Sequence, residues 1–246
     1  MEITSRSNER IKFIRSLKQQ KYRKESGLHL IEGERLVCDA ILSGAQIQTI
    51  LVDEDAGRNP SYDTYELIQV SRSVLESLSD TKNPQHVLAV VKTPVYDIQN
   101  IPDGFLLALD ALQDPGNLGT ILRSADAFGV SGVLLGEGCC EAFSPKAVRS
   151  SMGSCYHLPI VNCSLKDILE EKNASGYTCV CGHLKGSEKR PVFESDKRIL
   201  VIGNEGNGVS EEISSLCTKY RLPMKGRAES LNAAVAASVL LFLFSE

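Results

Sequence analysis

The residues best suited to chemistry lie where a turn enters a helix, in the stretch DPGNLGTILRSADAFGV at residues 114–130. Asn117 offers both a hydrogen-bond donor and an acceptor, and Arg123 offers a cation that stays protonated. The glycines that flank Asn117 allow a backbone to approach a ligand closely. Two structural explanations stand beside a chemical one. Asn117 is a good helix N-cap, and Arg123 can pair with Asp126 one helical turn away.

A second glycine-bearing turn lies in RILVIGNEGNGVSEEI at residues 198–213. Its spacing, G-x-x-G-x-G, is neither the dinucleotide fingerprint G-x-G-x-x-G nor the phosphate-binding loop that ends in Lys. Glu205 would repel phosphate groups in such a turn. Its carboxylate instead suits a ligand with a positive charge or an arginine that needs a partner, and Arg123 is the arginine that we expect it to hold.

A third stretch, RLPMKGRAESLNAAVAASVLLFLF at residues 221–244, begins with polar residues and ends in an apolar helix. Ser230 and Asn232 stand where side-chain oxygens cap the first backbone N–H groups of a helix. Small residues follow and allow another backbone to approach. The rest of the helix is apolar all round, so we expect it to be almost fully buried, in a core or in a subunit interface.

The elements that must position these residues alternate between strands and helices. In the second half, five apolar runs are typical of strands buried on both faces of a parallel sheet: FLLALDAL, GVLLG, LPIVN, YTCVC and RILVIG. Helical stretches lie between or after them: LGTILRSADAF, SPKAVRSSMG, SLKDILEEK and SEEISSLCTK. The first part has the same alternation at a smaller scale. The sequence therefore predicts an α/β fold with a smaller domain over residues 1–94, a linker over 95–104 and a larger domain over 105–246.

The composition of the 246-residue chain excludes several classes of protein. Apolar residues make up 42% and charged residues 24%, which are the values of an ordinary globular protein and not of a disordered one. No apolar run is long enough to span a membrane and the first residues lack a secretory signal, so we expect a cytoplasmic protein. None of the eight cysteines forms a C-x-x-C pair and the four histidines show no ligand spacing. We therefore expect reduced thiols and no metal.

The charge is distributed unevenly. Residues 1–24 hold eight Lys or Arg and two Glu, which makes this stretch +6, whereas the whole chain is -4 and the remainder must be -10. The stretch NERIKFIRSLKQQKYRKE predicts one amphipathic helix with a basic outer face. Such a face favours contact with the phosphates of a polyanion, although a merely solvated helix is the alternative. The candidate cations for this contact are Arg10, Lys12, Arg15 and Lys18.

The three motifs, taken in order, resemble those of the SpoU (TrmH-like) RNA 2'-O-ribose methyltransferases of the SPOUT superfamily. The segment SRSNERIKFIRSLKQQKYRKESGLHLIEGERLV also resembles the L30e-like substrate-binding domain that precedes the catalytic domain in many of these enzymes. The resemblance implies bound S-adenosylmethionine, a trefoil knot in the C-terminal domain and a homodimer. It also implies an RNA substrate, with large-subunit ribosomal RNA favoured over transfer RNA.

The resemblance carries over residue by residue. The positions that match the family's catalytic residues are Asn117, Arg123, Glu205, Ser230 and Asn232. The positions that match its cofactor contacts are Gly203, Leu222 and Leu231. In SPKAVRSSMG, Lys146 and Arg149 are candidates for RNA phosphate contact. No histidine lies in the three motifs, and an arginine that stays protonated is a poor base. We therefore expect Arg123 to stabilise the oxyanion that develops as a ribose hydroxyl is methylated; a general-base role is the alternative if the site strongly perturbs the guanidinium.

Two other functions compete with this one. A catalytically silent RNA-binding protein would keep the fold and lose the motif side chains, which are all present here. A dinucleotide-dependent oxidoreductase is disfavoured by the glycine spacing.

Overall fold

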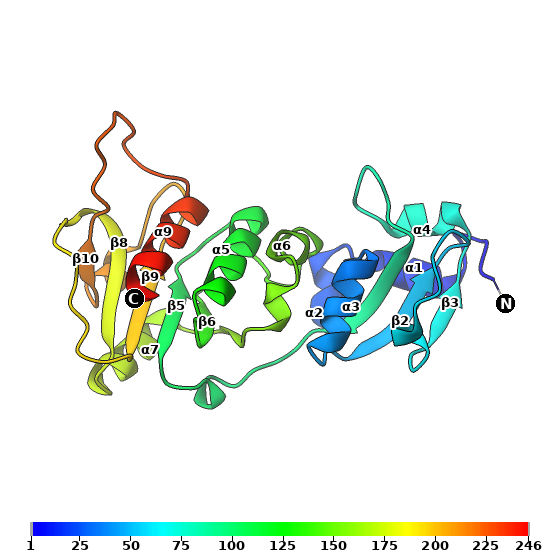
Figure 1. The fold of residues 1–246 in the computed structure, drawn as a ribbon, viewed down its shortest axis with the longest axis horizontal. Helices are drawn as coiled ribbons and strands as arrows, with labels where there is room; N and C mark the ends of the chain where they lie inside the picture. Colours follow the sequence, from blue (N-terminus) through cyan, green and yellow to red (C-terminus); the bar gives the residue numbers. More distant parts are fainter. Residues whose placement is uncertain (1, 246) are drawn as a thin grey trace. The chain divides into compact units, whose positions relative to one another are not determined.

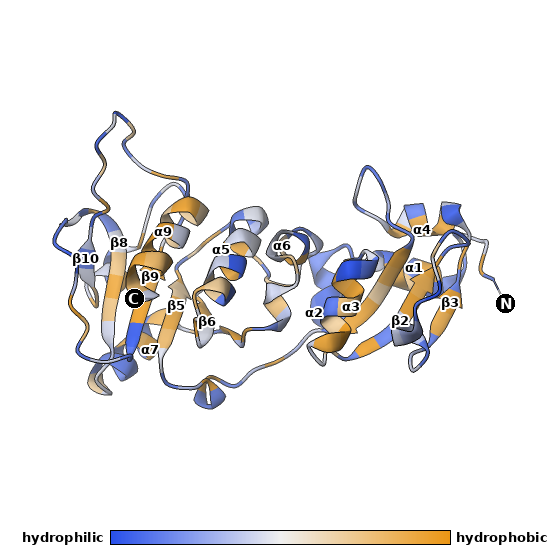
Figure 2. Cartoon of the chain, in the orientation of Figure 1, coloured by the Kyte–Doolittle hydropathy of each residue, from blue (hydrophilic) through white to orange (hydrophobic). Residues whose placement is uncertain are grey.

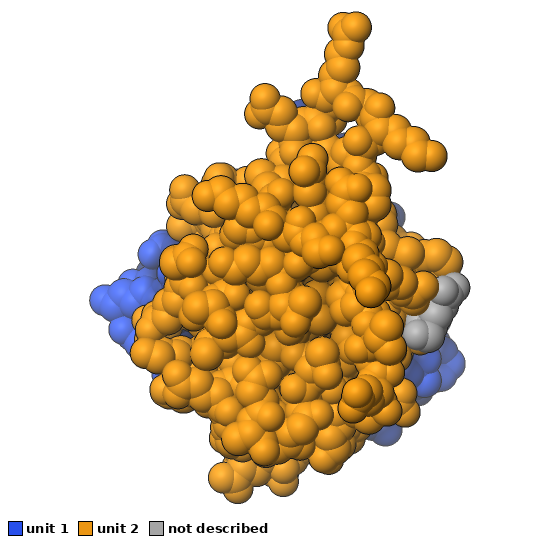
Figure 3. Space-filling view, turned by 90° about the vertical axis from the view of Figure 1, so that its left-hand side faces the viewer, with its two compact units in different colours: residues 1–94, 143–156 blue, residues 95–142, 157–246 orange. Residues whose placement is uncertain are grey.

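The chain folds into two compact units in the computed structural model, which describes residues 2–245 (Figures 1 and 3). The first unit combines the chain up to Pro94 with Phe143–Tyr156, and the second combines Val95–Ala142 with the chain from His157 onwards. The predicted division at residues 94 and 104 did not anticipate that the segment 143–156 packs with the first unit.

The first unit is built on a mixed four-stranded sheet in the order β1-β4-β2-β3. β4 pairs antiparallel with both β1 and β2, and β3 pairs parallel with β2. Its strands are β1 (Leu28–Glu32), β2 (Ile47–Val52), β3 (Leu67–Gln69) and β4 (Val87–Lys92). Its helices are α1 (Glu9–Ser16), α2 (Gln20–Ser26), α3 (Glu34–Leu42), α4 (Arg72–Leu78) and α6 (Pro145–Ser151), with short 3-10 turns at Pro60–Tyr62 and Ser154–Tyr156.

The predicted single basic helix is wrong, because the chain breaks into α1 and α2. Gln19 is extended, with φ -93° and ψ 135°. The Arg23 guanidinium donates to the carbonyl oxygens of Leu17 and Lys18 at 2.9 and 2.7 Å. A side chain thus satisfies carbonyl groups that a continuing helix would have used. The apolar face is as expected, since Ile11, Ile14 and Leu17 are buried in one core cluster with α4 and the sheet.

A buried histidine joins the segment 143–156 to the sheet of the first unit. His29 of β1 is completely buried, and its ring nitrogens lie 3.0 Å from Thr93 Oγ1 and 2.7 Å from Tyr156 Oη. The ring also packs against Phe143, at 5.0 Å between centroids. Burial, helped by the charge of Arg23, lowers the pKa of His29 to about 3. The neutral imidazole, with one donor and one acceptor nitrogen, matches its two hydroxyl partners.

The second unit is built on a six-stranded sheet in which every neighbouring pair is parallel, in the order β10-β8-β9-β5-β6-β7. The apolar colour in Figure 2 is concentrated on its central strands. The strands are β5 (Phe105–Leu109), β6 (Gly132–Leu135), β7 (Ile160–Asn162), β8 (Thr178–Ser187), β9 (Arg198–Ile202) and β10 (Thr218–Tyr220). The helices are α5 (Pro115–Ala127), α7 (Leu165–Ala174), α8 (Glu211–Ser214) and α9 (Ala233–Ser245), with a 3-10 turn at Ile98–Asn100.

Helices cover this sheet on both faces, as the predicted α/β fold requires. Alternate residues of β5 and β9 form one buried cluster with residues of α7 and α8. On the other face α5 packs along α9 (Figure 1), and the hydroxyls of Ser124 and Ser238 lie 2.7 Å apart between the two helices. The small side chains at the start of α9 allow this close approach, as the sequence predicted.

One expectation for the second unit is wrong, and another is not met within one chain. The predicted helix over 210–219 ends after one turn at Ser214, and strand β10 begins at Thr218. α9 is not almost fully buried within one chain, since Val235, Val239 and Phe242 are 49, 39 and 51% exposed. The alternative that this helix belongs to a subunit interface remains a prediction. Within residues 2–245, no helix combines the length and apolarity needed to cross a membrane.

The buried imidazole predicts a pH dependence of stability. Because its pKa is lowered from 6.5 to about 3 in the folded chain, the stability contributed by neutral His29 is complete above pH 6.5 and is lost as the pH falls towards 3. One pKa unit corresponds to about 1.4 kcal/mol, so the wild type should lose about 3 kcal/mol more than His29→Gln between pH 6.5 and about pH 4. Urea unfolding at a series of pH values measures this, and parallel profiles would contradict it.

Candidate active site

The three sequence motifs meet at one edge of the parallel sheet of the second unit. β5 leads into the turn 110–114, its neighbour β9 leads into the turn 203–208, and β10 leads into the loop 221–232. Strand order reverses at β5 and β9, because the chain runs outward through β6 and β7 and then returns. The carboxyl ends of strands at such a switch point are where open α/β sheets bind ligands.

One side chain from each motif takes part in a continuous chain of hydrogen bonds. The Asn232 amide donates to Asn117 Oδ1 at 3.1 Å, and the Asn117 amide donates to Glu205 Oε1 at 3.0 Å. Glu205 also accepts the backbone N–H groups of Asp114 at 3.0 Å and Gln113 at 3.2 Å. The structure therefore brings Asn117, Glu205 and Asn232 together, as the motif order suggested.

Glu205 is held in its charged form by these donors. Burial alone would raise its pKa, but the Asn117 amide and the backbone N–H groups of Asp114 and Gln113 outweigh burial and lower the pKa below its usual value. A carboxylate that accepts several N–H bonds is stabilised as the anion. The turn is therefore organised around one negative charge.

The structural role first considered for Asn117 is wrong. α5 begins at Pro115, and its N-cap is Asp114, whose carboxylate accepts the backbone N–H of Asn117 at 2.8 Å. Asn117 lies inside the first turn, so its amide is free to reach the other motifs. The sequence did contain the signal, because Asp followed by Pro is a strong helix start.

The turn after β5 contains a strained residue and is hydrogen-bonded to two other segments of the second unit. Ala111 has a positive φ of 53°, and its carbonyl oxygen accepts the Asn204 amide at 2.8 Å. The Leu112 N–H donates to the Cys139 thiol at 3.3 Å. Gly203 is needed in the opposing turn, since a Cβ there would lie 2.1 Å from the carbonyl carbon of Gly208. Sequence reasoning missed Asn204 and Cys139, whose partners are distant in the chain.

Arg123 is exposed, and the structure does not join it to the hydrogen-bonded chain of Asn117 and Glu205. Six residues along α5 place it about 9 Å further along the helix axis and about a third of a turn around from Asn117. The expected partners are engaged elsewhere: Glu205 accepts Asn117, and Asp126 lies 2.7 Å from His157 Nδ1. Within residues 2–245 the Arg123 guanidinium has no hydrogen-bond or ion-pair partner.

A pocket of about 300 Å³ lies beside the third motif. Leu222 and Leu231 line it, as expected of cofactor contacts, whereas Gly203 does not belong to its lining. Leu231 is followed by Asn232, so the pocket adjoins the hydrogen-bonded chain. Asn232 caps α9 through the backbone N–H of Ala234 at 2.9 Å, as predicted. Ser230 is exposed nearby and makes no hydrogen bond within the described chain.

The four predicted RNA contacts in the N-terminal segment all have partners within the first unit. The Arg10 guanidinium binds the Glu66 carboxylate and Thr49, and the Lys18 ammonium binds Asp80 at 2.9 Å. Lys12 pairs with Glu9 at 2.7 Å, and Arg15 donates to the Arg6 carbonyl and the Ser77 hydroxyl. On α6 of the same unit, Lys146 and Arg149 are exposed. Three of the four N-terminal cations, Arg10, Lys12 and Lys18, are thus paired with carboxylates, whereas Arg15 bonds neutral oxygens.

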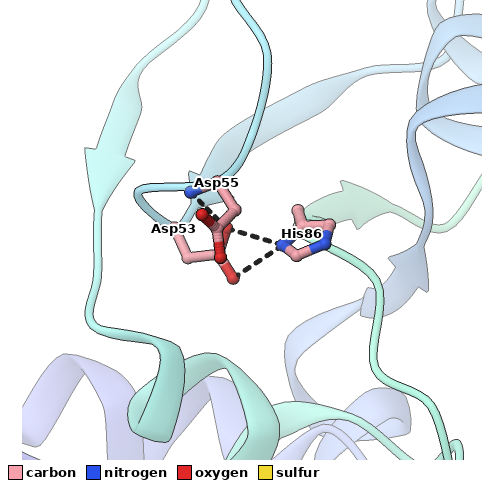
Figure 4. Close-up of side chains that lie close together, drawn as sticks. All are labelled: Asp53, Asp55 and His86. Atoms are coloured by element: carbon pink, nitrogen blue, oxygen red, sulfur yellow. Dashed lines mark hydrogen bonds and ion pairs between the residues drawn. The ribbon is translucent and has the colours of Figure 1, made fainter.

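Among the described residues, one group of three side chains has the spacing of metal ligands: Asp53, Asp55 and His86 (Figure 4). His86 Nδ1 lies 3.0 Å from Asp53 Oδ1, and Arg72 donates to Asp53 Oδ2 at 2.9 Å. Burial would raise the pKa of Asp53, but Arg72 and His86 outweigh it and lower the pKa. A guanidinium already neutralises this carboxylate, so the group is an ion-pair network. All eight cysteines are free thiols.

The fold and the site define an α/β protein with a polar cluster drawn from three turns at the switch point of a parallel sheet, which is where open α/β sheets bind ligands. The model of the SpoU rRNA Methylase family matches residues 104–242, and that of the MRM3-like substrate binding domain matches residues 8–89. The chain belongs to the SpoU rRNA methylase family.

Relatives and solved structures agree with this membership. The chain is 34% identical to the 23S rRNA (guanosine(2553)-2'-O)-methyltransferase RlmP of Bacillus subtilis, over 98% of each protein. It is 34% identical to the 23S rRNA (uridine(2479)-2'-O)-methyltransferase of Streptomyces viridochromogenes, over 98% of this chain and 90% of that one. The AdoMet-bound rRNA methyltransferase from Sinorhizobium meliloti superposes with a TM-score of 0.89 at 33% identity, over 98% and 96%.

The role of Glu205 as a backbone acceptor is testable by amide hydrogen exchange. Glu205→Ala should accelerate exchange of the Gln113 and Asp114 amides by roughly 2- to 10-fold, because each loses a hydrogen bond worth about 0.5–1.5 kcal/mol. The Leu112 amide, which donates to Cys139, should change little. Glu212→Ala removes an exposed acid that pairs with Lys166 and serves as the matched control. Unchanged exchange at both amides would refute the role.

Proposed function

We propose that the chain is an S-adenosylmethionine-dependent methyltransferase that modifies a ribose 2'-hydroxyl in large-subunit ribosomal RNA. The observation that carries this proposal is the hydrogen-bonded chain of Asn232, Asn117 and Glu205, which ties the three family motifs together beside one pocket. Family membership and the names of the relatives support the reaction class.

The residues at the pocket fit S-adenosylmethionine. Its lining is mainly apolar, with Leu222, Pro223, Met224 and Leu231, and its volume of about 300 Å³ is at the lower end for small-molecule sites. The ionised Glu205, two hydrogen bonds away through Asn117 and Asn232, provides the negative potential that a sulfonium ion favours. When bound, the cofactor supplies a methyl group attached to this sulfonium.

The chain's own residues must align the ribose and stabilise charge on its oxygen. Methyl transfer would break the carbon–sulfur bond of the cofactor and leave a neutral thioether, and the ribose hydroxyl would give up its proton to solvent water. Negative charge would develop on the oxygen because the proton departs ahead of the new oxygen–carbon bond. Arg123, exposed and without a partner in residues 2–245, is the proposed stabiliser of that charge. Asn117 and Asn232 keep the turns in register, and Ser230 is placed to hold the ribose or its phosphate.

A homodimer is proposed because one chain does not complete this site. Arg123 is not joined to the hydrogen-bonded chain, and the neighbouring helix α9 exposes Val235 and Phe242. Phe242 already packs on Phe128 of α5, at 5.8 Å between ring centroids. We propose that a second copy buries this apolar strip and that its pocket is the one that receives Arg123. The trefoil knot implied by the family also remains a prediction.

Ribosomal RNA is preferred to transfer RNA as substrate because of the relatives' names and the MRM3-like substrate binding domain. We propose the cytoplasm as the place of action, and Lys146 and Arg149 on α6 as phosphate contacts. The N-terminal cations Arg10, Lys12, Arg15 and Lys18 already have partners, and they are proposed to contact RNA only where they exchange these partners for phosphates.

Replacing Arg123 tests the chemical proposal. Arg123→Ala should lower the rate of tritiated methyl transfer to 23S ribosomal RNA by about 100- to 1000-fold, the usual cost of losing one oxyanion donor. The affinity for S-adenosylmethionine should fall much less than the rate, because Arg123 does not line the pocket of its own chain and is proposed to act on the ribose oxygen. Arg123→Lys should retain part of the rate. Full methyl transfer by Arg123→Ala would exclude the proposed role.

Replacing an exposed residue of α9 tests the homodimer. Phe242→Glu should convert a dimer into a monomer in light scattering and abolish methyl transfer, because a charge would be buried in an apolar interface. Val192→Glu, at a position 81% exposed in the second unit, should leave both properties unchanged. A fully active monomer would disprove the shared site.

A further inference from the structure

A cluster of positive charge with few acidic partners lies in the second unit, at the edge formed by β8 and β10. Residues 183–190 and 219–227 together contain seven Lys or Arg and one acidic residue. We define the basic edge by its members: Lys185, Lys189, Lys219, Arg221, Lys225 and Arg227. Sequence analysis did not identify this edge, because the two segments are separated by β9 and α8 in the chain.

The backbone brings the two segments into direct contact. A Cβ added to Gly186 would lie 2.6 Å from the carbonyl carbon of Lys219, so the strands approach as closely as glycine allows. The Arg221 N–H donates to the Ser187 carbonyl oxygen at 2.9 Å. Lys185 and Lys189 therefore lie beside Lys219 and Arg221 on one sheet edge.

Most of these charges are available to a partner. Within residues 2–245, the side chains of Lys185, Lys189, Lys225 and Arg227 are exposed and have no ion-pair or hydrogen-bond partner. The two pairs that exist are loose: Arg221 lies 3.7 Å from Glu188, and Lys219 lies 3.6 Å from Glu211. This contrasts with the N-terminal segment, where Arg10 and Lys18 are bound to carboxylates.

The basic edge leads to the proposed cofactor pocket. After β10 the chain enters the third motif, where Lys225 lines the pocket together with Leu222 and Leu231. A strand of RNA whose ribose reached the pocket would carry its neighbouring phosphates along this edge. Leu184, 63% exposed among the lysines, offers an apolar surface for a base.

We propose that the basic edge binds the phosphates of the RNA strand that flanks the methylated nucleotide. This inference rests on the proposed function. The phosphodiester backbone is the chosen partner because the edge holds several free cations and no fixed carboxylate pattern that would specify a protein surface.

The test uses the double variant Lys185→Gln/Lys189→Gln of the full chain. Neither residue lines the pocket. Fluorescence anisotropy gives the affinity for an in vitro transcript of 23S ribosomal RNA between about 50 and 200 mM KCl. Two lost phosphate contacts should reduce the slope of log K against log salt by about 1.4 and weaken binding about 25-fold in 0.1 M salt. The affinity for S-adenosylmethionine should stay constant and shows that the second unit is folded.

The matched control is Lys172→Gln/Lys197→Gln, which removes the same charge from the same unit. Both lysines lie over the Tyr177 ring, at 5.1 and 5.7 Å, and so near the amino end of β8. Eight residues of strand separate Tyr177 from Lys185, which is about 26 Å. The control should bind RNA with the salt slope of the wild type.

The outcomes separate this inference from the proposed function. The inference would be overturned if the Lys185→Gln/Lys189→Gln variant bound RNA with the affinity and salt slope of the wild type. It would also be overturned if the control variant lost as much RNA affinity. Either result would count against the inference even if the wild type methylates the transcript. A specific loss of binding in a protein that transfers no methyl group would support the edge and refute the proposed function. A loss confined to assembled ribosomal subunits, with protein-free RNA bound normally, would indicate an acidic protein partner and contradict the inference.

Discussion

The site depends on one carboxylate, that of Glu205, and the donors gathered around it. Glu205 accepts two backbone N–H groups of the turn after β5 and the amide of Asn117, and Asn117 in turn accepts from Asn232. Without a carboxylate there, the backbone N–H groups of Gln113 and Asp114 would lose their acceptor, next to a strained Ala111 that is held by Asn204. The parallel sheet provides the meeting place, since all its strands point their carboxyl ends to the same edge.

The residues that hold the turns together differ from the residues proposed to act on the substrate. Asn117, Asn232 and Glu205 use their polar atoms on one another, so they keep the turns together. Arg123 and Ser230 are left exposed and without a partner in the described chain. A second copy of the chain and the RNA would supply the partners that these two side chains lack in one chain. The apolar strip on α9 and the basic edge of β8 and β10 are the surfaces that would receive them.

Local signals in the sequence predicted much of the fold, and distant contacts explain what they missed. Continuous apolar runs predicted β5, β6 and β9, and the glycine turns predicted the site edge. The break between α1 and α2 depends on Arg23, which satisfies the carbonyl of Leu17 through tertiary geometry. Strand β10 is three residues long and exists because β8 provides its ladder.

In the candidate site, too, local sequence signals were informative and contacts between distant residues were missed. Motif order placed Asn117, Glu205 and Asn232 together, but pairing of Glu205 with Arg123 could not be decided from types and spacing, since the acceptor had nearer donors. The N-terminal cations looked free in the sequence because their partners are far along the chain: Glu66 lies 56 residues from Arg10. Charge counted along a sequence overstates the charge that a folded surface presents.

The most direct test of the hydrogen-bonded chain is a double-mutant cycle on Asn117→Ala and Asn232→Ala, read out as kcat/KM for methyl transfer to 23S ribosomal RNA. If one hydrogen-bonded chain holds the motifs, either substitution breaks it. The double variant should then be little worse than the poorer single variant, with a coupling energy of about 0.5–3 kcal/mol. Strictly additive losses would show that the two residues act independently and would contradict a shared role in holding the three turns.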